Sequence, residues 1–164
     1  MDEKRLRLKI LSLLLQYPDD DLRGLLGTIG EAAGELAEEE PKAIFHGFVT
    51  HLGETPMMRL QEEYTSLFDL NPSTCLNLTY HKWGNEKKRG KALAHLSSLY
   101  RQVGYEPITN ELPDYLPMVL EFLSVAPEDV CFFVLKEFEN EIQSLASRLR
   151  EMGSPYAGLL GLMK

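Results

Sequence analysis

The feature that most constrains the fold of this chain is the spacing of its apolar residues. They recur every three or four positions, which is the period of one face of an α-helix. One such set is Leu22, Leu25, Leu26, Ile29, Ala33 and Leu36, and the next is Ile44, Phe45, Phe48, Val49 and Leu52. No run of alternating β-branched residues competes with this pattern. The spacing therefore predicts an all-α protein.

Proline positions predict where several helices begin. Thr55-Pro56, Asn71-Pro72 and Ser154-Pro155 each put a capping side chain before a proline. Proline suits the first helical turn because it lacks an amide that would have no partner there. We expect a helical bundle of about eight to nine helices, near residues 4–17, 20–38, 42–53, 56–69, 73–81, 86–103, 115–125, 128–151 and 155–162. No repeat or linker divides residues 1–164, so we expect a single domain.

The charge of the chain argues against some classes of function. It has 17 Lys and Arg against 25 Asp and Glu, for a formal net charge of -8. A nucleic-acid binder needs a basic surface, whereas a negative field attracts basic partners. The apolar stretch at residues 6–17 is interrupted by Arg7 and Lys9 and is too short to span a bilayer. We therefore expect a cytoplasmic protein without membrane insertion or nucleic-acid binding.

No motif in the sequence predicts catalysis or a metal site. The four histidines are too scattered for a ligand pattern, and the two cysteines, Cys75 and Cys131, form no CxxC pair. His81 and Cys75 could meet in space, but their spacing alone does not predict that they do. There is no GxSxG, Walker or GxGxxG sequence. We expect no catalytic residues, no bound metal and no enzyme activity.

Basic residues cluster between positions 82 and 91 of this acidic chain. Lys87, Lys88 and Arg89 fall in the first turn of a predicted helix, where free amides and the helix dipole favour anions. These three residues are candidates for anion binding. The alternative function for the chain is accordingly a small helical enzyme, or an anion- or nucleotide-binding protein, that uses segment 82–91. The simpler explanation is a solvated charged turn, because no glycine-rich cradle accompanies the cluster.

The stretch ELPDYLPMVLEFL, residues 111–123, contains two prolines and still carries a helical stripe. Asp114 is a candidate cap for this helix. Pro117 then falls in the first turn, where its missing amide leaves no hydrogen bond unmade. The stripe consists of Leu116, Val119, Leu120 and Leu123, and Glu121 lies off it. The prolines are therefore compatible with a helix that begins near residue 115.

Three segments give the chain a family resemblance. They are EEYTSLFDLNPSTCLNLTYH at residues 62–81, WGNEKKRGKALAHL at 83–96 and ELPDYLPMVLEFL at 111–123. In this order and separation they resemble the NarJ-type assembly chaperones of respiratory nitrate reductase (the delta subunit family), within the wider TorD and DmsD group of redox-enzyme maturation proteins. The resemblance covers nearly the whole chain. The chain departs from the family pattern at residues 84–90, where the family is richer in arginine, and at Tyr115, where it often has His.

The resemblance implies an all-helical, TorD-like chaperone that is not an enzyme. Such proteins bind the N-terminal segment of a molybdoenzyme catalytic subunit in the cytoplasm. They support insertion of the molybdopterin guanine dinucleotide cofactor before the respiratory complex assembles. No permanently bound cofactor is expected, but Lys87, Lys88 and Arg89 are candidates for a transient contact with its phosphates. The sequence leaves open whether the protein is a monomer or a homodimer.

From this resemblance we hypothesise a groove for the client segment. A helical peptide can lay its apolar face between helices, and carboxylates at the rim would meet Lys and Arg of the client. Both relevant segments carry aromatic and acidic residues together. The side chains expected to line the groove are Tyr64, Phe68, Tyr115 and Leu120, and those expected near its edge are Asp69, Glu111, Asp114 and Glu121.

Overall fold

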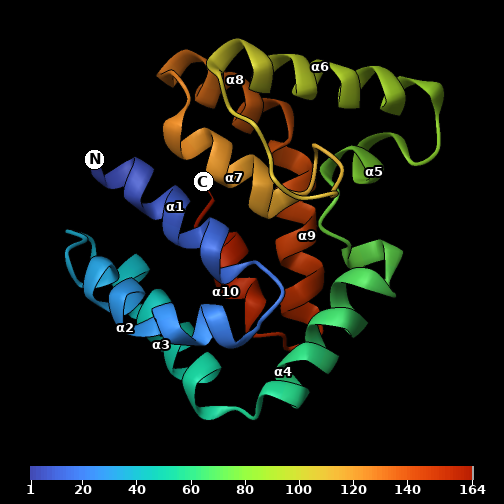
Figure 1. Ribbon diagram of the computed structural model, residues 1–164. Helices are drawn as coiled ribbons and strands as arrows, with labels where there is room; N and C mark the ends of the chain where they lie inside the picture. The colour runs from blue at the N-terminus through green and yellow to red at the C-terminus, as the bar shows by residue number, and fades with distance from the viewer. Residues whose placement is uncertain (164) are drawn as a thin grey trace.

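The computed structural model describes residues 1–163, which fold into helices joined by mostly short connections (Figure 1). The α-helices are α1 Glu3–Leu14, α2 Asp20–Gly34, α3 Glu39–Glu54, α4 Met57–Tyr64, α5 Leu78–Trp83, α6 Lys87–Val103, α7 Leu116–Val125, α8 Glu128–Glu137, α9 Glu139–Glu151 and α10 Tyr156–Gly161. A π-helical turn, η1 Thr65–Asp69, continues α4, and a 3-10 turn, η2 Pro72–Thr74, precedes α5. Residues 1–163 contain no strand, so the predicted all-α class is confirmed.

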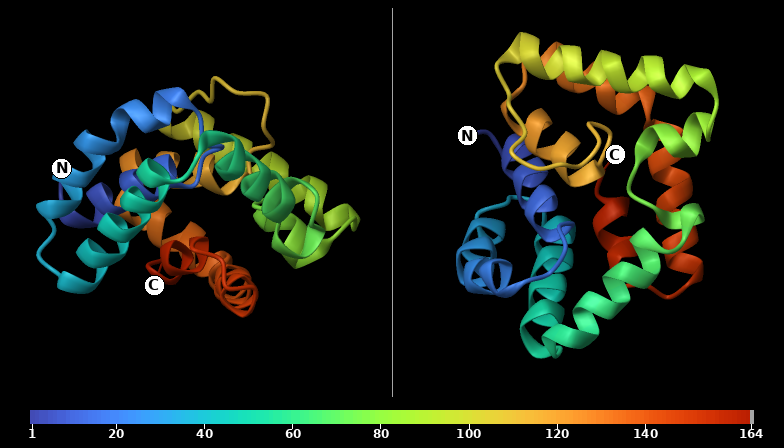
Figure 2. Two further views of the ribbon diagram at one scale, coloured as in Figure 1. Left: turned by 90° about the horizontal axis from the view of Figure 1, so that it is seen from below. Right: turned by 45° about the vertical axis from the view of Figure 1, so that its right-hand side comes forward.

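The helices form a compact arrangement around α1, α7, α9 and α10. α1 packs along α7, α9 packs against α10, and α2 pairs with α3. α6 and α8 lie side by side at one end of the molecule, and α2, α3 and α4 lie at the other (Figure 1, Figure 2). Among the described helices, none is long and apolar enough to cross a membrane.

An aromatic cluster holds the middle of this arrangement together. Tyr156 of α10 makes edge-on contacts with Phe48 of α3 and Phe68 of η1, with ring centroids 4.8 Å and 5.0 Å apart. Tyr64 of α4 meets Phe68 in the same manner at 4.8 Å. All four rings are buried, and edge-to-face pairs of this kind add to the free energy gained by burying apolar area. The cluster therefore fixes α3, α4 and α10 against one another.

The single helix predicted over residues 128–151 is wrong, because α8 and α9 are separate helices that meet at Phe138. The backbone of Phe138 has φ −109° and ψ 12°, outside the helical region. Lys82 donates to the carbonyl oxygen of Glu137 at 2.7 Å, an acceptor that a continuous helix would use for the amide four residues later. The break turns Phe138 into the core, where it is 3% exposed. The described residues thus contain ten α-helices rather than about eight to nine.

The helix predicted over residues 73–81 is also only partly correct. After η2 the chain runs extended before α5 begins, and it pairs there with the residues that precede α7. The amide of Leu116 donates to the carbonyl oxygen of Leu76 at 2.8 Å, and the amide of Leu78 donates to the carbonyl oxygen of Asp114 at 3.2 Å. This short antiparallel bridge, between Asn77 and Tyr115, sets the position at which α7 starts.

Candidate functional site

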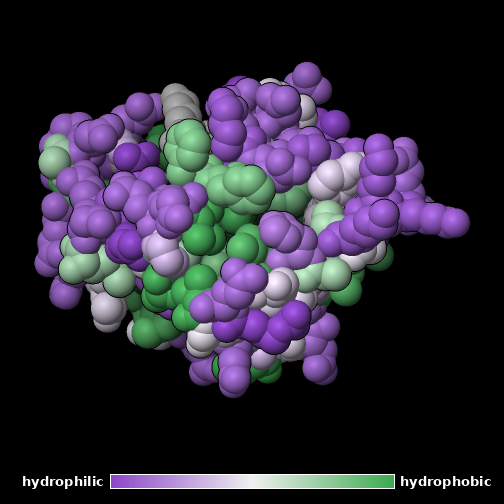
Figure 3. Space-filling model, turned by 90° about the horizontal axis from the view of Figure 1, so that it is seen from above, coloured by the Kyte–Doolittle hydropathy of each residue, from purple (hydrophilic) through white to green (hydrophobic). Residues whose placement is uncertain are grey.

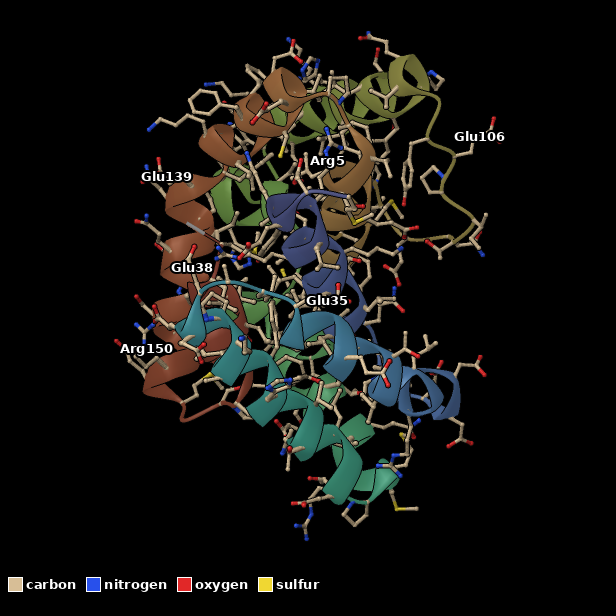
Figure 4. The ribbon with its side chains drawn as sticks, turned by 90° about the vertical axis from the view of Figure 1, so that its left-hand side faces the viewer. Arg5, Glu35, Glu38, Glu106, Glu139 and Arg150 are labelled. Atoms are coloured by element: carbon tan, nitrogen blue, oxygen red, sulfur yellow. The ribbon has the colours of Figure 1, made fainter. Side chains whose placement is uncertain are left out.

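A groove opens beside the start of α7, where three segments meet. Its volume is about 630 Å³. Its walls are the turn between α1 and α2, the loop over residues 105–115 and the first turns of α7. The residues that line this groove, hereafter the acidic groove, are Gln16, Tyr17, Asp19, Tyr105, Glu106, Pro107, Ile108, Thr109, Asn110, Glu111, Tyr115, Pro117, Met118 and Glu121. Figure 4 shows Glu106 projecting from the loop at the outer edge of the molecule.

The lining of the acidic groove is negatively charged. It includes four carboxylates, from Asp19, Glu106, Glu111 and Glu121, and no Lys, Arg or His. The nearest cation paired with any of them is Lys9, whose Nζ lies 3.7 Å from Glu121 Oε1. Asp19 is partly committed to the fold, since it caps α2 by accepting from the amide of Leu22 at 2.8 Å. The groove therefore favours a positively charged ligand.

Tyr115 forms the floor of this groove and is held by hydrogen bonds from beneath. The hydroxyl of Tyr64 donates to the carbonyl oxygen of Leu15 at 2.8 Å, so the Tyr115 hydroxyl donates to the Tyr64 oxygen. Burial raises the pKa of Tyr115 to about 12. Burial, with the nearby Glu121 carboxylate, likewise raises the pKa of Tyr105 to about 12. Both phenols are therefore neutral near pH 7 and offer aromatic surface and hydrogen bonds rather than charge.

Asp114 does not lie in the groove, because its side chain is fully buried. Its carboxylate accepts hydrogen bonds from the Asn77 side-chain amide at 2.9 Å, the Thr79 backbone amide at 3.0 Å and the Thr79 hydroxyl at 2.5 Å. Arg89 Nη2 lies 3.9 Å from the same carboxylate. The three hydrogen bonds and the positive charge of Arg89 together stabilise a carboxylate that would otherwise be costly to bury.

The prediction that Asp114 caps the helix after it is therefore wrong. The N-cap residue of α7 is Tyr115, which makes no capping hydrogen bond with its side chain. Asp114 instead satisfies an amide in the first turn of α5. Its carboxylate faces there because the bridge between Asn77 and Tyr115 brings the two segments together. A free backbone amide, a hydroxyl and a guanidinium together stabilise the carboxylate more than the amides of a local cap would.

The model of the nitrate reductase delta subunit family matches residues 25–160 of the chain. This chain belongs to that family. It is 33% identical over 162 residues to the probable nitrate reductase molybdenum cofactor assembly chaperone NarJ of Bacillus subtilis, across 98% of this chain and 88% of that protein. It is also 33% identical over 161 residues to the nitrate reductase molybdenum cofactor assembly chaperone NarJ of Escherichia coli, across 96% of this chain and 68% of that protein.

These delta-family relatives are named as assembly chaperones and not as catalysts, which confirms the prediction that the chain is not an enzyme. A crystal structure of a protein from Archaeoglobus fulgidus, assigned to redox enzyme maturation, has the same fold. It superposes with a TM-score of 0.72 at 27% identity, and the match covers 99% of this chain and 93% of that one. The predicted TorD-like fold is thereby supported.

In this delta-family member, the eight residues predicted to bind a partner lie in different places. Glu111, Tyr115 and Glu121 line the acidic groove. Phe68 belongs to the aromatic cluster, and Leu120 is 0% exposed in the core. Neither side chain lines the groove, because each faces the interior of the bundle.

Besides the buried Asp114, two more residues of that set, Tyr64 and Asp69, do not line the groove. Tyr64 is buried beneath Tyr115 and supports its hydroxyl. Asp69, at the end of η1, is exposed and makes no hydrogen bond or ion pair within residues 1–163. Its negative charge is close enough to contribute to the raised pKa of Tyr115, after the larger effect of burial.

Several lining residues were not predicted from the sequence. Tyr17 and Asp19 come from the turn after α1, and Tyr105 and Glu106 come from the loop after α6. Each pair repeats the combination of a tyrosine with a nearby carboxylate that drew attention to Glu111 and Tyr115. That repeated combination, at Tyr17-Pro18-Asp19 and Tyr105-Glu106, is the signal that would have found them.

The three residues predicted to bind anions do not act as one cluster. Lys87 and Lys88 are exposed in the first turn of α6. Arg89 turns inward, donates to the Thr79 hydroxyl at 3.0 Å and lies over the Tyr80 ring at 5.6 Å. Because Arg89 also neutralises Asp114, its charge is already used within the fold. Only the two lysines are available to an external anion.

Cys75 and His81 do meet, although they form no metal centre. The Cys75 sulfur lies 3.7 Å from His81 Nε2, and the Cys75 carbonyl oxygen lies 2.6 Å from the same nitrogen. Burial raises the pKa of the Cys75 thiol and lowers the pKa of His81, so both groups favour their neutral forms. Within residues 1–163 no group of three or more His, Cys, Asp or Glu side chains is placed to hold a metal ion.

Proposed function

We propose that this protein is a cytoplasmic assembly chaperone for a molybdoenzyme. In this proposal it binds the N-terminal segment of the catalytic subunit of respiratory nitrate reductase and supports insertion of the molybdenum cofactor before the complex assembles. Family membership and the names of the relatives support the chaperone role and the class of client. The protein releases its client afterwards and is not a permanent subunit.

The observation that carries the proposal is the acidic groove. It combines four carboxylates with three tyrosines, from residues 17, 105 and 115, and the side chain of Met118. A client segment that is amphipathic and rich in Lys and Arg can place apolar side chains on the tyrosines while its cations meet the rim. Rim charges of this kind steer the encounter and fix the orientation more than they raise the affinity.

A transient contact with the phosphates of the molybdopterin guanine dinucleotide remains part of the proposal. The client holds that cofactor, and the chaperone offers Lys87 and Lys88 from the exposed start of α6. Arg89 contributes to the buried network around Asp114. A test of the contact therefore has to change the two lysines and leave Arg89 in place.

The test of client binding is a calorimetric titration with a synthetic peptide of the client's N-terminal segment. Glu111 lies on the exposed loop and makes no ion pair within the described residues, so Glu111→Lys changes the groove charge without disturbing the core. An exposed ion pair is worth about 0.2–1 kcal/mol. Reversing the charge should roughly double that effect, which corresponds to an affinity loss of about 2- to 30-fold at low salt.

The matched control for that titration is Glu35→Lys. Glu35 is also exposed and lies at the end of α2, outside the acidic groove (Figure 4). It changes the net charge by the same amount as Glu111→Lys. Equal affinity losses in the two variants would show that net charge, and not the acidic groove, attracts the peptide, and they would contradict the proposed site.

A further inference from the structure

A second groove lies at the other end of the molecule, between α6 and α8. Its volume is about 310 Å³, at the lower end of the range for binding sites. The residues that line it are Trp83, Lys88, Lys91, Ala92, His95, Leu96, Leu99, Phe133, Val134, Glu137 and Phe138. It shares none of them with the acidic groove, and we refer to it as the α6–α8 groove.

The α6–α8 groove is apolar and open to solvent. Phe133 is 53% exposed and its neighbour Phe132 is 66% exposed, although phenylalanine is normally buried. The Phe133 ring lies against the His95 ring with centroids 6.1 Å apart, so it is held over the groove. On the face that carries α6 and α8, apolar residues gather in a hollowed band bordered by hydrophilic ones (Figure 3). An exposed apolar patch with a polar rim is typical of an interaction surface.

The rim of the α6–α8 groove is positively charged, unlike the chain as a whole. Lys88 and Lys91 are exposed along α6, and neither forms an ion pair within residues 1–163. The one carboxylate in the lining, Glu137, is already paired with Lys82 at 3.2 Å. The groove therefore offers two unpaired lysines beside an apolar floor. Its charge is opposite to that of the acidic groove, so the basic client segment does not match it.

We propose that the α6–α8 groove docks an acidic amphipathic helix of a partner protein. The groove runs between two helices, and no strand edge within the described residues is available for an extended peptide to join. Leucine-sized side chains of the partner would lie on Phe133, Val134 and Leu96. Glutamates on one flank of that helix would meet Lys88 and Lys91.

A second copy of this chain is the less suitable occupant. Each copy carries a net charge of -8, so two copies repel each other as they approach. An acidic helix of another protein need not carry so large a negative charge, and its glutamates pair at short range with Lys88 and Lys91. The two grooves then let one chaperone molecule hold a basic segment and an acidic helix at the same time.

The probe for this proposal is a synthetic amphipathic helix with leucine at every third or fourth position and glutamate on one flank. A matched peptide carries lysine in place of every glutamate. Fluorescence anisotropy of the labelled peptides is measured against the full-length protein. We expect saturable binding of the acidic peptide that is stronger than that of the basic peptide. Phe133→Ala should weaken binding of the acidic peptide about tenfold, as loss of an aromatic anchor does. Lys91→Glu should also weaken it, and the loss of affinity should become larger as the salt concentration is lowered.

Two surface variants serve as controls. Leu70→Ala removes a side chain that is 74% exposed outside the α6–α8 groove, and Lys4→Glu reverses an exposed charge on α1. These two variants should leave binding of the acidic peptide unchanged, and Glu111→Lys in the acidic groove should leave it unchanged as well. Because that variant weakens the client peptide only, failure of one proposal is distinguishable from failure of the other. Thermal melting of Phe133→Ala checks that the fold is retained.

Three results would overturn the proposal. The first is no saturable binding of the acidic peptide to the wild-type protein. The second is binding that Phe133→Ala and Lys91→Glu leave unchanged. The third is a homodimer in analytical ultracentrifugation that Phe133→Ala converts to monomer, because a second copy of the chain would then be the occupant.

Discussion

Removal of the buried carboxylate of Asp114 should strongly destabilise this fold. Asp114 joins three helices, because it accepts from Thr79 in α5, approaches Arg89 in α6 and comes immediately before Tyr115, the N-cap residue of α7. Asp114→Ala removes every one of these contacts and leaves Arg89 without its carboxylate. The backbone hydrogen bond from Leu78 to the Asp114 carbonyl oxygen survives the change. The effect therefore isolates the side chain.

The expected loss follows from the three hydrogen bonds on the carboxylate, at 2.9, 3.0 and 2.5 Å. A hydrogen bond to a charged group contributes about 1.5–3 kcal/mol, so three would sum to about 5–9 kcal/mol. That sum is an upper limit, because Asn77 and Arg89 are only half-buried and recover water as a partner. Removing one member of a buried ion pair typically costs about 3–5 kcal/mol, and we expect Asp114→Ala to fall in that range.

Thermal unfolding followed by circular dichroism measures this loss. For a chain of this length about 1 kcal/mol lowers Tm by about 2–4 °C, so Asp114→Ala should lower Tm by about 6–20 °C. Asp114→Asn keeps the size of the side chain but supplies one acceptor instead of two, and it should fall between the wild type and Asp114→Ala. Asp69→Ala is the matched control, because an exposed aspartate without partners should change stability by less than about 0.5 kcal/mol.

A Tm for Asp114→Ala within about 2 °C of the wild type would mean that the carboxylate contributes less than its buried hydrogen bonds imply. The same conclusion would follow if Asp69→Ala and Asp114→Ala were destabilised equally.

Two further predictions concern stability. Gly104 ends α6 with a φ of 84°, so Gly104→Ala should destabilise the fold by about 1–2 kcal/mol. Gly24 lies in the exposed interior of α2 with open space around it, so Gly24→Ala should stabilise the fold by about 0.5–1 kcal/mol. Chemical denaturation measures both free energies of unfolding, and equal shifts in the two variants would contradict the prediction. Burial lowers the pKa of His81 below its usual 6.5, so the unfolded state takes up this proton first and His81 makes stability fall as the pH drops below about 6.5. His81→Gln should lose less stability than the exposed control His46→Gln between pH 7.5 and 5.5, and a larger loss in His81→Gln would contradict this prediction.

Helix positions were largely predictable from the sequence, because apolar periodicity and capping residues act within a single segment. Predictions failed where a distant side chain intervened. Nothing local to residues 128–151 predicts a helix end at Glu137, where Lys82, 55 positions away, donates to the carbonyl oxygen. Asp114 is a similar case, because the local sequence predicted that it caps α7, whereas the tertiary bridge places its carboxylate at the first turn of α5.

The candidate site was predictable only in part, for a related reason. An apolar stripe shows which side of a helix is buried but not which stripe residue borders an opening. Leu120 and Phe68 were therefore expected in a groove and lie in the core. Charged residues of the same segments gave better guidance, because Glu111 and Glu121 cannot be buried without partners and both line the acidic groove.

The hydrogen-bonded chain from Tyr115 through Tyr64 to the Leu15 carbonyl oxygen has a consequence for how ligands are selected. It ties the N-cap residue of α7 to the end of α1, so two walls of the acidic groove are joined through the protein interior. Their separation is set before any ligand binds, so most of the conformational entropy lost on binding is that of the peptide. A peptide that is too wide cannot gain space by spreading these walls. The width of a client's apolar face, and not only its charge, should therefore decide which segments the groove accepts.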